Sequence, residues 1–204
     1  MDINNELVKI VNHWDELFKT IEVKKVSIED FPNDNPLSEA IIDMASKSET
    51  ILDIGTGSGY ALFMSAFYGT KFKKGLGIDP SVHAIKTLNE ICKASKLSQI
   101  SFEVGDHNTL EHLEAESFDC IICSNVLDVL PEVITKSIIK SIKRLLKPGG
   151  LLILKLYFFL TPNLIERLKM EEVAPNTYAM NGIIRGLNYP SEHWVNWFKP
   201  FSLL

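Results

Sequence analysis

The sequence predicts an α/β protein built on a doubly wound, mostly parallel sheet with helices on both faces. Two observations predict this fold class. Short, almost continuously apolar runs alternate with longer segments of helical periodicity, and a glycine-rich turn follows the first of the central runs. The chain has 204 residues, of which 46% are hydrophobic and 23% charged, so it is long enough to bury one substantial core in one domain.

Five runs rich in Ile, Leu, Val and Phe are the expected strands of the central sheet. They cover residues 50–55, 75–79, 100–106, 118–125 and 151–159. Strands that are buried on both faces of a parallel sheet have this continuous apolar character. Two further strands are expected on either side of Asn181-Gly182, a dipeptide typical of two-residue hairpin turns. The sequence therefore predicts a seven-stranded sheet.

Helices are expected between these strands, over residues 59–68, 81–96 and 131–147. Ser81 is placed as an N-cap of the second helix, because its hydroxyl is able to accept a bond from a free backbone N–H. Pro131 opens the third helix, and the Pro-Gly-Gly turn at 148–150 closes it.

The two ends of the chain are expected to flank a cofactor-binding core at 49–159. Residues 1–48 form a helical lead-in or cap, with a first amphipathic helix and a second short one at 37–45. Residues 160–204 begin with a helix and continue with the hairpin and a closing helix. An alternative makes the final residues FSLL a strand.

Charge and cysteine content bound the function class. A formal net charge of −5 disfavours a nucleic-acid partner, because that affinity comes from clustered Lys and Arg. No stretch approaches the roughly 20 apolar residues of a membrane span, and the N-terminus lacks a signal-peptide pattern, so we expect a cytoplasmic protein without a membrane partner. Cys92, Cys120 and Cys123 fit a reducing compartment and are expected to be buried and unreactive.

The strongest local signal is the segment LDIGTGSGY at residues 52–60. A glycine-rich turn between a strand and a helix lets a ligand approach the backbone closely and presents N–H groups to an anionic group. The dinucleotide fingerprint G-x-G-x-x-G requires a glycine at position 60, where this chain has Tyr60. The spacing therefore disfavours a dehydrogenase on a similar sheet.

From about residue 50 to 155 the chain resembles the class I S-adenosylmethionine-dependent methyltransferases, which have a Rossmann-like fold. LDIGTGSGY resembles the first motif of that family, GLGIDPS the second, VGDHNTL the third, FDCIICSNVLDVLP the fourth and IKRLLKPGGLLIL the fifth. The five matches are in order and at the usual spacing. The resemblance implies methyl transfer with S-adenosyl-L-methionine as cofactor and S-adenosyl-L-homocysteine as product.

The resemblance also implies where parts of the cofactor are held. Asp53 and the backbone of the glycine turn would receive the methionine end, with the carboxylate of Asp53 favouring the ammonium group. Asp79, at the end of the second strand, would accept hydrogen bonds from both ribose hydroxyls. The turn residues that it assigns are Gly55, Thr56, Gly57 and Gly59.

Four further residues and one proline complete the implied cofactor site. Asp106 would accept from the adenine amine, with Pro80 and His107 bounding the ring. Ser124 and Asn125 would hold the methionine end. Three alternatives stay open: Asp106 as a turn cap, His107 as a solvent-facing histidine, and Asn125 as a turn cap.

Methyl transfer from a sulfonium is an in-line displacement, in which alignment and exclusion of water are the main tasks of the protein. No obligatory catalytic residue follows from it. If the acceptor must lose a proton, Asp128 is a candidate base, and the alternative is a structural or surface role. The histidines have no spacing typical of metal ligands, so no metal is expected.

The acceptor is expected to be a small molecule. The fourth motif lacks the Asn/Asp-Pro-Pro-Tyr and Pro-Cys patterns of nucleobase and amide methyltransferases. In related small-molecule enzymes the N-terminal helices and the segment after strand five build the acceptor pocket. Here that pocket would draw on aromatic and cationic residues, whose alternative role is core packing: Trp14, Tyr157, Phe158, Tyr178 and Arg185.

Alternatives in three classes remain open at this stage. The first is a dehydrogenase, and the second is a methyltransferase fold that acts only as a protein partner. The third keeps the chemistry but moves the acceptor to RNA or protein, which salt-sensitive binding to a polyanion would support. A monomer and a homodimer are both compatible with the sequence.

Overall fold

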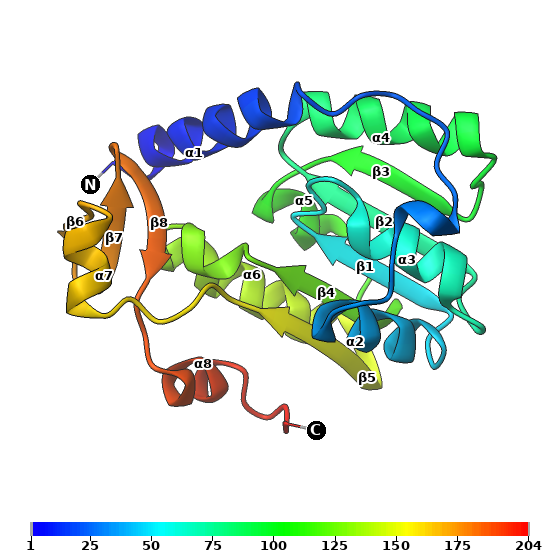
Figure 1. Cartoon of the computed structure of the whole chain (residues 1–204). Coiled ribbons are helices and arrows are strands. Elements are labelled where there is room, and N and C mark those ends of the chain that lie inside the picture. The colour runs from blue at the N-terminus through cyan, green and yellow to red at the C-terminus, as the bar shows by residue number, and fades with distance from the viewer. Residues whose placement is uncertain (1, 204) are drawn as a thin grey trace.

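The computed structural model describes residues 2–203 and contains two sheets (Figure 1). The central sheet has five strands in the order β3-β2-β1-β4-β5, and every neighbouring pair is parallel. Its strands are β1 (Thr50–Ile54), β2 (Lys74–Asp79), β3 (Ile100–Val104), β4 (Phe118–Ser124) and β5 (Leu146–Lys155). The α/β class and the mostly parallel sheet are therefore confirmed.

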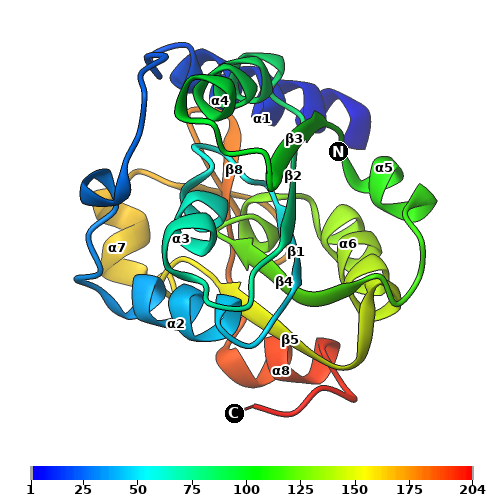
Figure 2. The same cartoon turned by 90° about the vertical axis from the view of Figure 1, so that its right-hand side faces the viewer.

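Helices cover both faces of the central sheet (Figure 2). One face carries α2 (Pro36–Ala45), α3 (Tyr60–Tyr68) and α4 (Val82–Ser95). The other carries α5 (His107–His112), α6 (Glu132–Leu145) and α8 (Ser191–Trp197). The chain order reverses between β1 and β4, and at such a switch point an α/β sheet leaves a crevice beyond the carboxyl ends of its strands.

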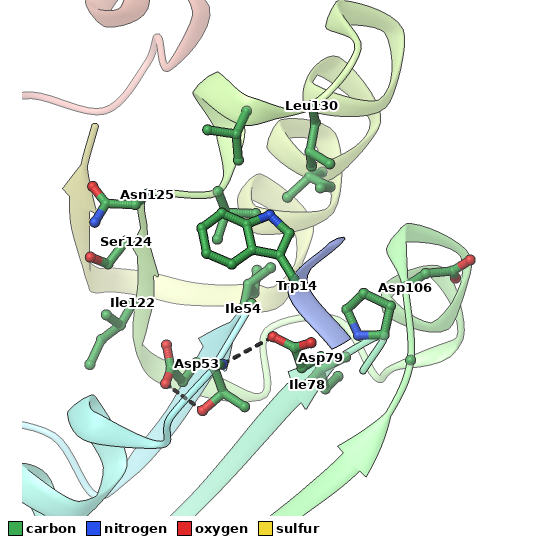
Figure 3. Close-up of a pocket in the computed structure, with 18 of the residues that line it drawn as sticks. Trp14, Asp53, Ile54, Ile78, Asp79, Asp106, Ile122, Ser124, Asn125 and Leu130 are labelled. Carbon is green, nitrogen blue, oxygen red and sulfur yellow. Dashed lines mark hydrogen bonds between the residues drawn. The ribbon is translucent and has the colours of Figure 1, made fainter. Parts of the chain in front are cut away.

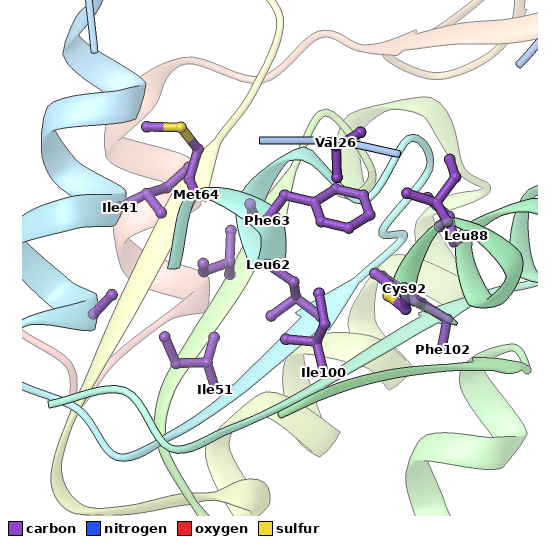
Figure 4. Close-up of a cluster of buried hydrophobic side chains, with 14 of the residues drawn as sticks. Val26, Ile41, Ile51, Leu62, Phe63, Met64, Leu88, Cys92, Ile100 and Phe102 are labelled. Atoms are coloured by element: carbon purple, nitrogen blue, oxygen red, sulfur yellow. The ribbon is translucent and has the colours of Figure 1, made fainter. Parts of the chain in front are cut away.

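The core consists of two clusters, one on each face of the sheet. Ile51 packs with Leu62 and Phe63 in the first cluster (Figure 4), and its neighbour Leu52 packs in the second. Residues 120–123 of β4 alternate between the clusters in the same way, and all four are fully buried. A Leu or Ile side chain buried in this way contributes about 1.5–3 kcal/mol relative to an exposed one. This two-sided burial explains why the strands are continuously apolar.

The capping residues predicted from the sequence mark the starts of α4 and α6, but the predicted end of α6 differs. The Ser81 hydroxyl accepts a hydrogen bond from Ala84 N at 3.0 Å, as an N-cap should. Helix α6 begins directly after Pro131, as expected, but it ends at Leu145. The Pro-Gly-Gly turn at 148–150 lies inside β5, where the register with β4 shifts, so it interrupts the strand and does not end the helix.

The prediction of one seven-stranded sheet is wrong. The Asn181-Gly182 turn joins β7 (Thr177–Met180) to β8 (Ile183–Leu187) as expected, and both turn residues have positive φ, 54° and 74°. These strands pair with β6 (Glu171–Ala174), which was not predicted, in a separate antiparallel sheet. Helix α7 (Pro162–Arg167) precedes this small sheet.

The chain leaves the central sheet at Lys155, which explains the separation. Residues 156–159 were expected to continue β5, but Tyr157 N donates to the Asp128 carboxylate at 2.6 Å and does not join a strand. The hairpin therefore does not extend the edge of β5. Residues 201–203 form no strand, and Leu204 lies outside the described residues.

The remaining elements are α1 (Ile3–Phe18) and two short 3-10 helices, η1 (Ile28–Asp30) and η2 (Leu127–Val129). Helix α1 runs from the small sheet to α4, across the side on which the parallel strands end (Figure 1). Among residues 2–203, no helix has the length and apolar character to cross a membrane. The three cysteines are free and buried, as expected, and burial raises the pKa of Cys120 to about 12.

The amino ends of the central strands are joined by Asp119. Its Oδ2 accepts from the backbone N–H groups of Glu49 and Thr50 at 3.0 and 2.9 Å, and its Oδ1 accepts from Lys147 Nζ at 2.7 Å. Burial alone would raise the pKa of Asp119, but these donors lower it to about 2. The ionised carboxylate thus ties β1, β4 and β5 together.

We expect Asp119→Ala to lower the free energy of unfolding by about 1–3 kcal/mol at pH 7, because Glu49 N, Thr50 N and Lys147 Nζ lose a charged acceptor. Since the folded pKa is below the ordinary 3.8, this contribution is present above pH 4 and is lost as the pH falls toward 2. Urea unfolding at pH 7 and pH 3 measures both effects. Asp43→Ala is the control, because Asp43 forms an exposed surface pair with Lys47, and equal losses in the two variants would contradict the assignment.

Candidate functional site

A cavity of about 380 Å³ lies at the carboxyl ends of β1, β2 and β4, beneath α1 (Figure 3). This is the switch point of the sheet. Of the predicted cofactor-binding residues, ten line it: Asp53, Gly55, Thr56, Gly57, Asp79, Pro80, Asp106, His107, Ser124 and Asn125. Gly59 is the exception and stands behind the wall, where it packs against Leu88 and Phe63.

The glycine turn is held against β2 by its backbone. The N–H groups of Gly55 and Thr56 donate to Ile78 O at 2.8 and 3.1 Å. Gly55 has φ 68°, and a Cβ added there would lie 2.3 Å from Val126 Cγ2. Glycine is therefore required at this position for both its backbone conformation and its lack of a side chain.

Asp53 is buried at the end of β1, with 4% of its surface exposed. Thr56 Oγ1 donates to its Oδ2 at 2.7 Å. Burial raises the pKa of Asp53 to about 7, and the nearby negative charge of Asp79 adds to this effect. A ligand cation placed here would stabilise the ionised carboxylate.

Asp79 is buried at the end of β2, beside Asp53, with 6% of its surface exposed (Figure 3). Its Oδ2 accepts from Gly57 N at 3.0 Å and its Oδ1 from Ser81 N at 2.9 Å. Burial raises its pKa above the ordinary value. Each oxygen retains a lone pair, so the carboxylate is able to accept from two adjacent hydroxyls.

Asp106 combines the two roles that the sequence left open. It caps α5, because its Oδ1 accepts from Asn108 N at 2.9 Å and Thr109 N at 3.3 Å, and it also lines the cavity. Its side chain is half exposed, whereas that of His107 is only 17% exposed. His107 therefore belongs to the cavity wall and is not a solvent-facing loop residue.

Ser124 and Asn125 lie where β4 ends. Asn125 has φ 56° and its N–H donates to Lys155 O at 2.8 Å, so it turns the chain out of the strand. Its Oδ1 accepts from Lys155 Nζ at 3.2 Å. The turn-forming role of Asn125 is thus present together with a place in the cavity wall.

Sequence reasoning missed the residues that fix α1 over the cavity. Asp15 Oδ1 accepts from Ser81 Oγ at 2.6 Å, and its Oδ2 lies 2.6 Å from His83 Nδ1. The bond from Ser81 is the largest cause that lowers the pKa of Asp15 to about 2. No local pattern marks Asp15, because its partners are about 66 residues away in the chain.

The predicted acceptor-pocket residues divide between two cavities. Trp14 lines the first, and Arg185 and Phe158 line a second cavity of about 450 Å³. Tyr157 lines both, and Tyr178 lines neither of them. Among residues 2–203, no three His, Cys, Asp or Glu side chains are grouped as a metal site.

Asp128, the candidate base, lies in the wall of the second cavity and not of the first. It is 4% exposed, and its Oδ2 accepts from Tyr157 N at 2.6 Å. Burial raises its pKa above the ordinary value. Its surface alternative is therefore wrong, and it holds the chain that leaves β5.

Comparisons with known proteins show the family to which the chain belongs. The family described as "Methyltransferase domain" matches residues 45–197. The ribosomal protein L11 methyltransferase of Geobacillus kaustophilus is 29% identical over 157 residues, which are 77% of this chain and 45% of that protein. The chain thus spans less than half the length of this curated relative.

Two solved structures share the fold. The PH0226 protein of Pyrococcus horikoshii has a TM-score of 0.59 at 20% identity, over 90% of this chain and 88% of that one. Phosphoethanolamine N-methyltransferase 1 of Haemonchus contortus, in complex with phosphoethanolamine and S-adenosylhomocysteine, has a TM-score of 0.53 at 18% identity, over 74% and 33% of the two chains. At these identities the likeness is one of fold.

Gly59→Ala is expected to destabilise the protein more than Gly182→Ala. Both glycines have φ 74°, so both variants carry the strain of a left-handed alanine, about 1–2 kcal/mol. A Cβ at position 59 would also lie 2.8 Å from Leu88 Cδ2, whereas nothing lies within 4 Å at position 182. Overpacking should add about 1–3 kcal/mol at Gly59. Urea unfolding of both variants tests this, and equal losses would show that the packing behind the glycine turn is not tight.

Proposed function

This chain belongs to the class I S-adenosylmethionine-dependent methyltransferases, and we propose that it binds S-adenosyl-L-methionine beneath α1 and methylates a small-molecule acceptor. The observation that carries the proposal is the convergence of ten motif residues, from four strand ends, on one cavity. When bound, the cofactor supplies a methyl group on a sulfonium, activated for in-line displacement. The product would be S-adenosyl-L-homocysteine.

The methionine end is assigned to Asp53 and the glycine turn. Asp53 is buried without a cationic partner among the described residues, which suits an ammonium group. Gly55 and Gly57 line the cavity with their backbone alone, and an added Cβ would lie 2.3 Å from Val126 Cγ2 at the first position and 3.2 Å from Phe18 Cζ at the second. Ser124 and Asn125 would complete this end of the site.

The nucleoside end is assigned to β2 and β3. Asp79 would accept from both ribose hydroxyls, as its buried position and its free lone pairs permit. Asp106 would accept from the adenine amine through its Oδ2, which accepts from Asn108 Nδ2 at 3.2 Å and keeps a further lone pair, whereas Oδ1 is used by the cap bonds. Pro80 and His107 would bound the ring.

The acceptor is proposed to be a small molecule, because the second cavity is of a size typical of small-molecule sites and the net charge is −5. A protein acceptor is the second candidate, favoured by the L11 methyltransferase named among the relatives. An RNA acceptor and a purely non-catalytic role have no comparable support.

Asp79→Asn should weaken binding of S-adenosyl-L-homocysteine by about 1–3 kcal/mol, roughly 5- to 150-fold, because the ribose loses a charged acceptor. Calorimetric titration measures the affinity, with NAD as the control ligand for the dehydrogenase alternative. Asp119→Asn is the matched control, since Asp119 lies at the opposite ends of the strands. Unchanged affinity in Asp79→Asn would remove the ribose assignment, and tight NAD binding would remove the cofactor assignment.

The affinity for S-adenosyl-L-homocysteine should fall as the pH falls below 7. Asp53 has a pKa of about 7 in the free protein, so below that pH a proton must leave before the carboxylate pairs with the ammonium group. The expected slope approaches tenfold per pH unit between pH 7 and pH 5. In Asp53→Asn the affinity should be weaker and its slope with pH smaller, because only Asp79, whose pKa is also raised, would still titrate, and an undiminished slope in that variant would disprove the role of Asp53.

A further inference from the structure

The second cavity has a wall that is fixed at two points. Figure 1 shows the chain leaving β5 and passing β8 on its way to α7. At the start of this segment Tyr157 N is bonded to Asp128. Further along, Leu160 N donates to Asn188 Oδ1 at 2.7 Å, and Asn188 Nδ2 donates back to Leu160 O at 2.9 Å. The segment between these points is therefore held in place as a wall.

The cavity adjoins the cofactor cavity through Tyr157, which lines both. Its other walls come from η2, β8 and α8. Aromatic side chains are prominent in the lining, and they are Tyr157, Phe158, Phe159, Tyr189 and Trp194. Phe158 and Phe159 are 65% and 56% exposed, although both are large apolar residues. Such a lining favours a flat, aromatic ligand.

Asp128 supplies an acceptor that no protein group uses. Its Oδ2 is bonded to Tyr157 N, but its Oδ1 is buried and has no hydrogen-bond partner among residues 2–203. Buried polar atoms in folded proteins are nearly always paired, and Asp128 is a residue that lines the cavity, so its unpaired oxygen indicates a place for a donor. The donor would be a hydroxyl or an amine of a ligand.

Arg185 supplies a charge that no protein carboxylate neutralises. Its guanidinium lies 5.0 Å from the ring centroid of Trp14, and Nη1 lies 3.1 Å from His13 Nε2. Within residues 2–203 no carboxylate lies within salt-bridge distance of it. A guanidinium has five N–H donors, so most remain able to bind an anion.

We propose that the second cavity is the acceptor site and that it binds a small aromatic carboxylate. The carboxylate pairs with Arg185, the ring packs against the aromatic lining, and a hydroxyl or amino group donates to Asp128 Oδ1. This inference rests on the proposed function, because the second cavity can be an acceptor site only if the first cavity, on the other side of Tyr157, binds the cofactor.

The experiment uses the full chain saturated with S-adenosyl-L-homocysteine and measures binding by saturation-transfer NMR and calorimetry. Three compounds are compared: 4-hydroxyphenylacetate, phenylacetate, which lacks the hydroxyl, and 4-methylphenol, which lacks the carboxylate. The first should bind at least tenfold more tightly than either of the others. No saturable binding of 4-hydroxyphenylacetate at millimolar concentration, or equal affinity for all three, would overturn the proposal.

Two variants assign the contacts. Asp128→Asn keeps an oxygen for Tyr157 N and should weaken 4-hydroxyphenylacetate about tenfold while leaving phenylacetate unchanged. Arg185→Gln should weaken both carboxylates and leave 4-methylphenol unchanged. Arg167→Gln, on the exposed surface of α7, is the control and should change nothing. Uniform loss for all three compounds would reject the assigned contacts.

The comparison of compounds on the unmodified protein decides the proposal even if a variant fails to fold. The same titrations also distinguish failure of the acceptor-site proposal from failure of the proposed function. Binding of S-adenosyl-L-homocysteine without binding of any aromatic carboxylate would reject the acceptor site alone. Failure to bind S-adenosyl-L-homocysteine would reject the proposed function itself.

Discussion

Two buried carboxylates on neighbouring strands, Asp53 and Asp79, are the constraint on which the rest of the site depends. Burial raises the pKa of both carboxyl groups, the nearby charge of Asp79 raises that of Asp53 further, and the charge of Asp15 raises that of Asp79. The glycine turn stabilises both carboxylates, because Thr56 Oγ1 donates to Asp53 and Gly57 N donates to Asp79. The turn has this shape only because Gly55 takes a positive φ against Val126. A ligand with an ammonium group and a diol would complete the compensation.

The elements outside the central sheet enclose this place. Helix α1 is joined to the start of α4 through Asp15 and His83, and to β8 through the contact of Trp14 with Arg185. The small sheet does not extend the central sheet, but it contacts α1, the helix that lies over the first cavity. Arg185 of β8 also lines the second cavity, and its guanidinium lies against Trp14, which lines the first.

Much of the fold and most of the site could be predicted because they depend on short-range patterns. Continuous apolar runs identified all five parallel strands, and the resemblance to the methyltransferase motifs identified ten residues that line the first cavity. The separate sheet could not be predicted, because the chain after β5 is held by tertiary hydrogen bonds of Tyr157 to Asp128 and of Leu160 to Asn188, which no local pattern marks. The hydrogen bond between Asp15 and Ser81 could not be predicted for the same reason, since nothing near Asp15 in the sequence marks its partner.

A crystal structure of the protein with S-adenosyl-L-homocysteine tests most directly whether the paired carboxylates hold the cofactor. The account predicts that the ligand lies beneath α1, with its ribose hydroxyls within hydrogen-bond distance of Asp79 and its ammonium group beside Asp53. A ligand bound elsewhere, or one whose ribose and ammonium groups contact neither carboxylate, would contradict it.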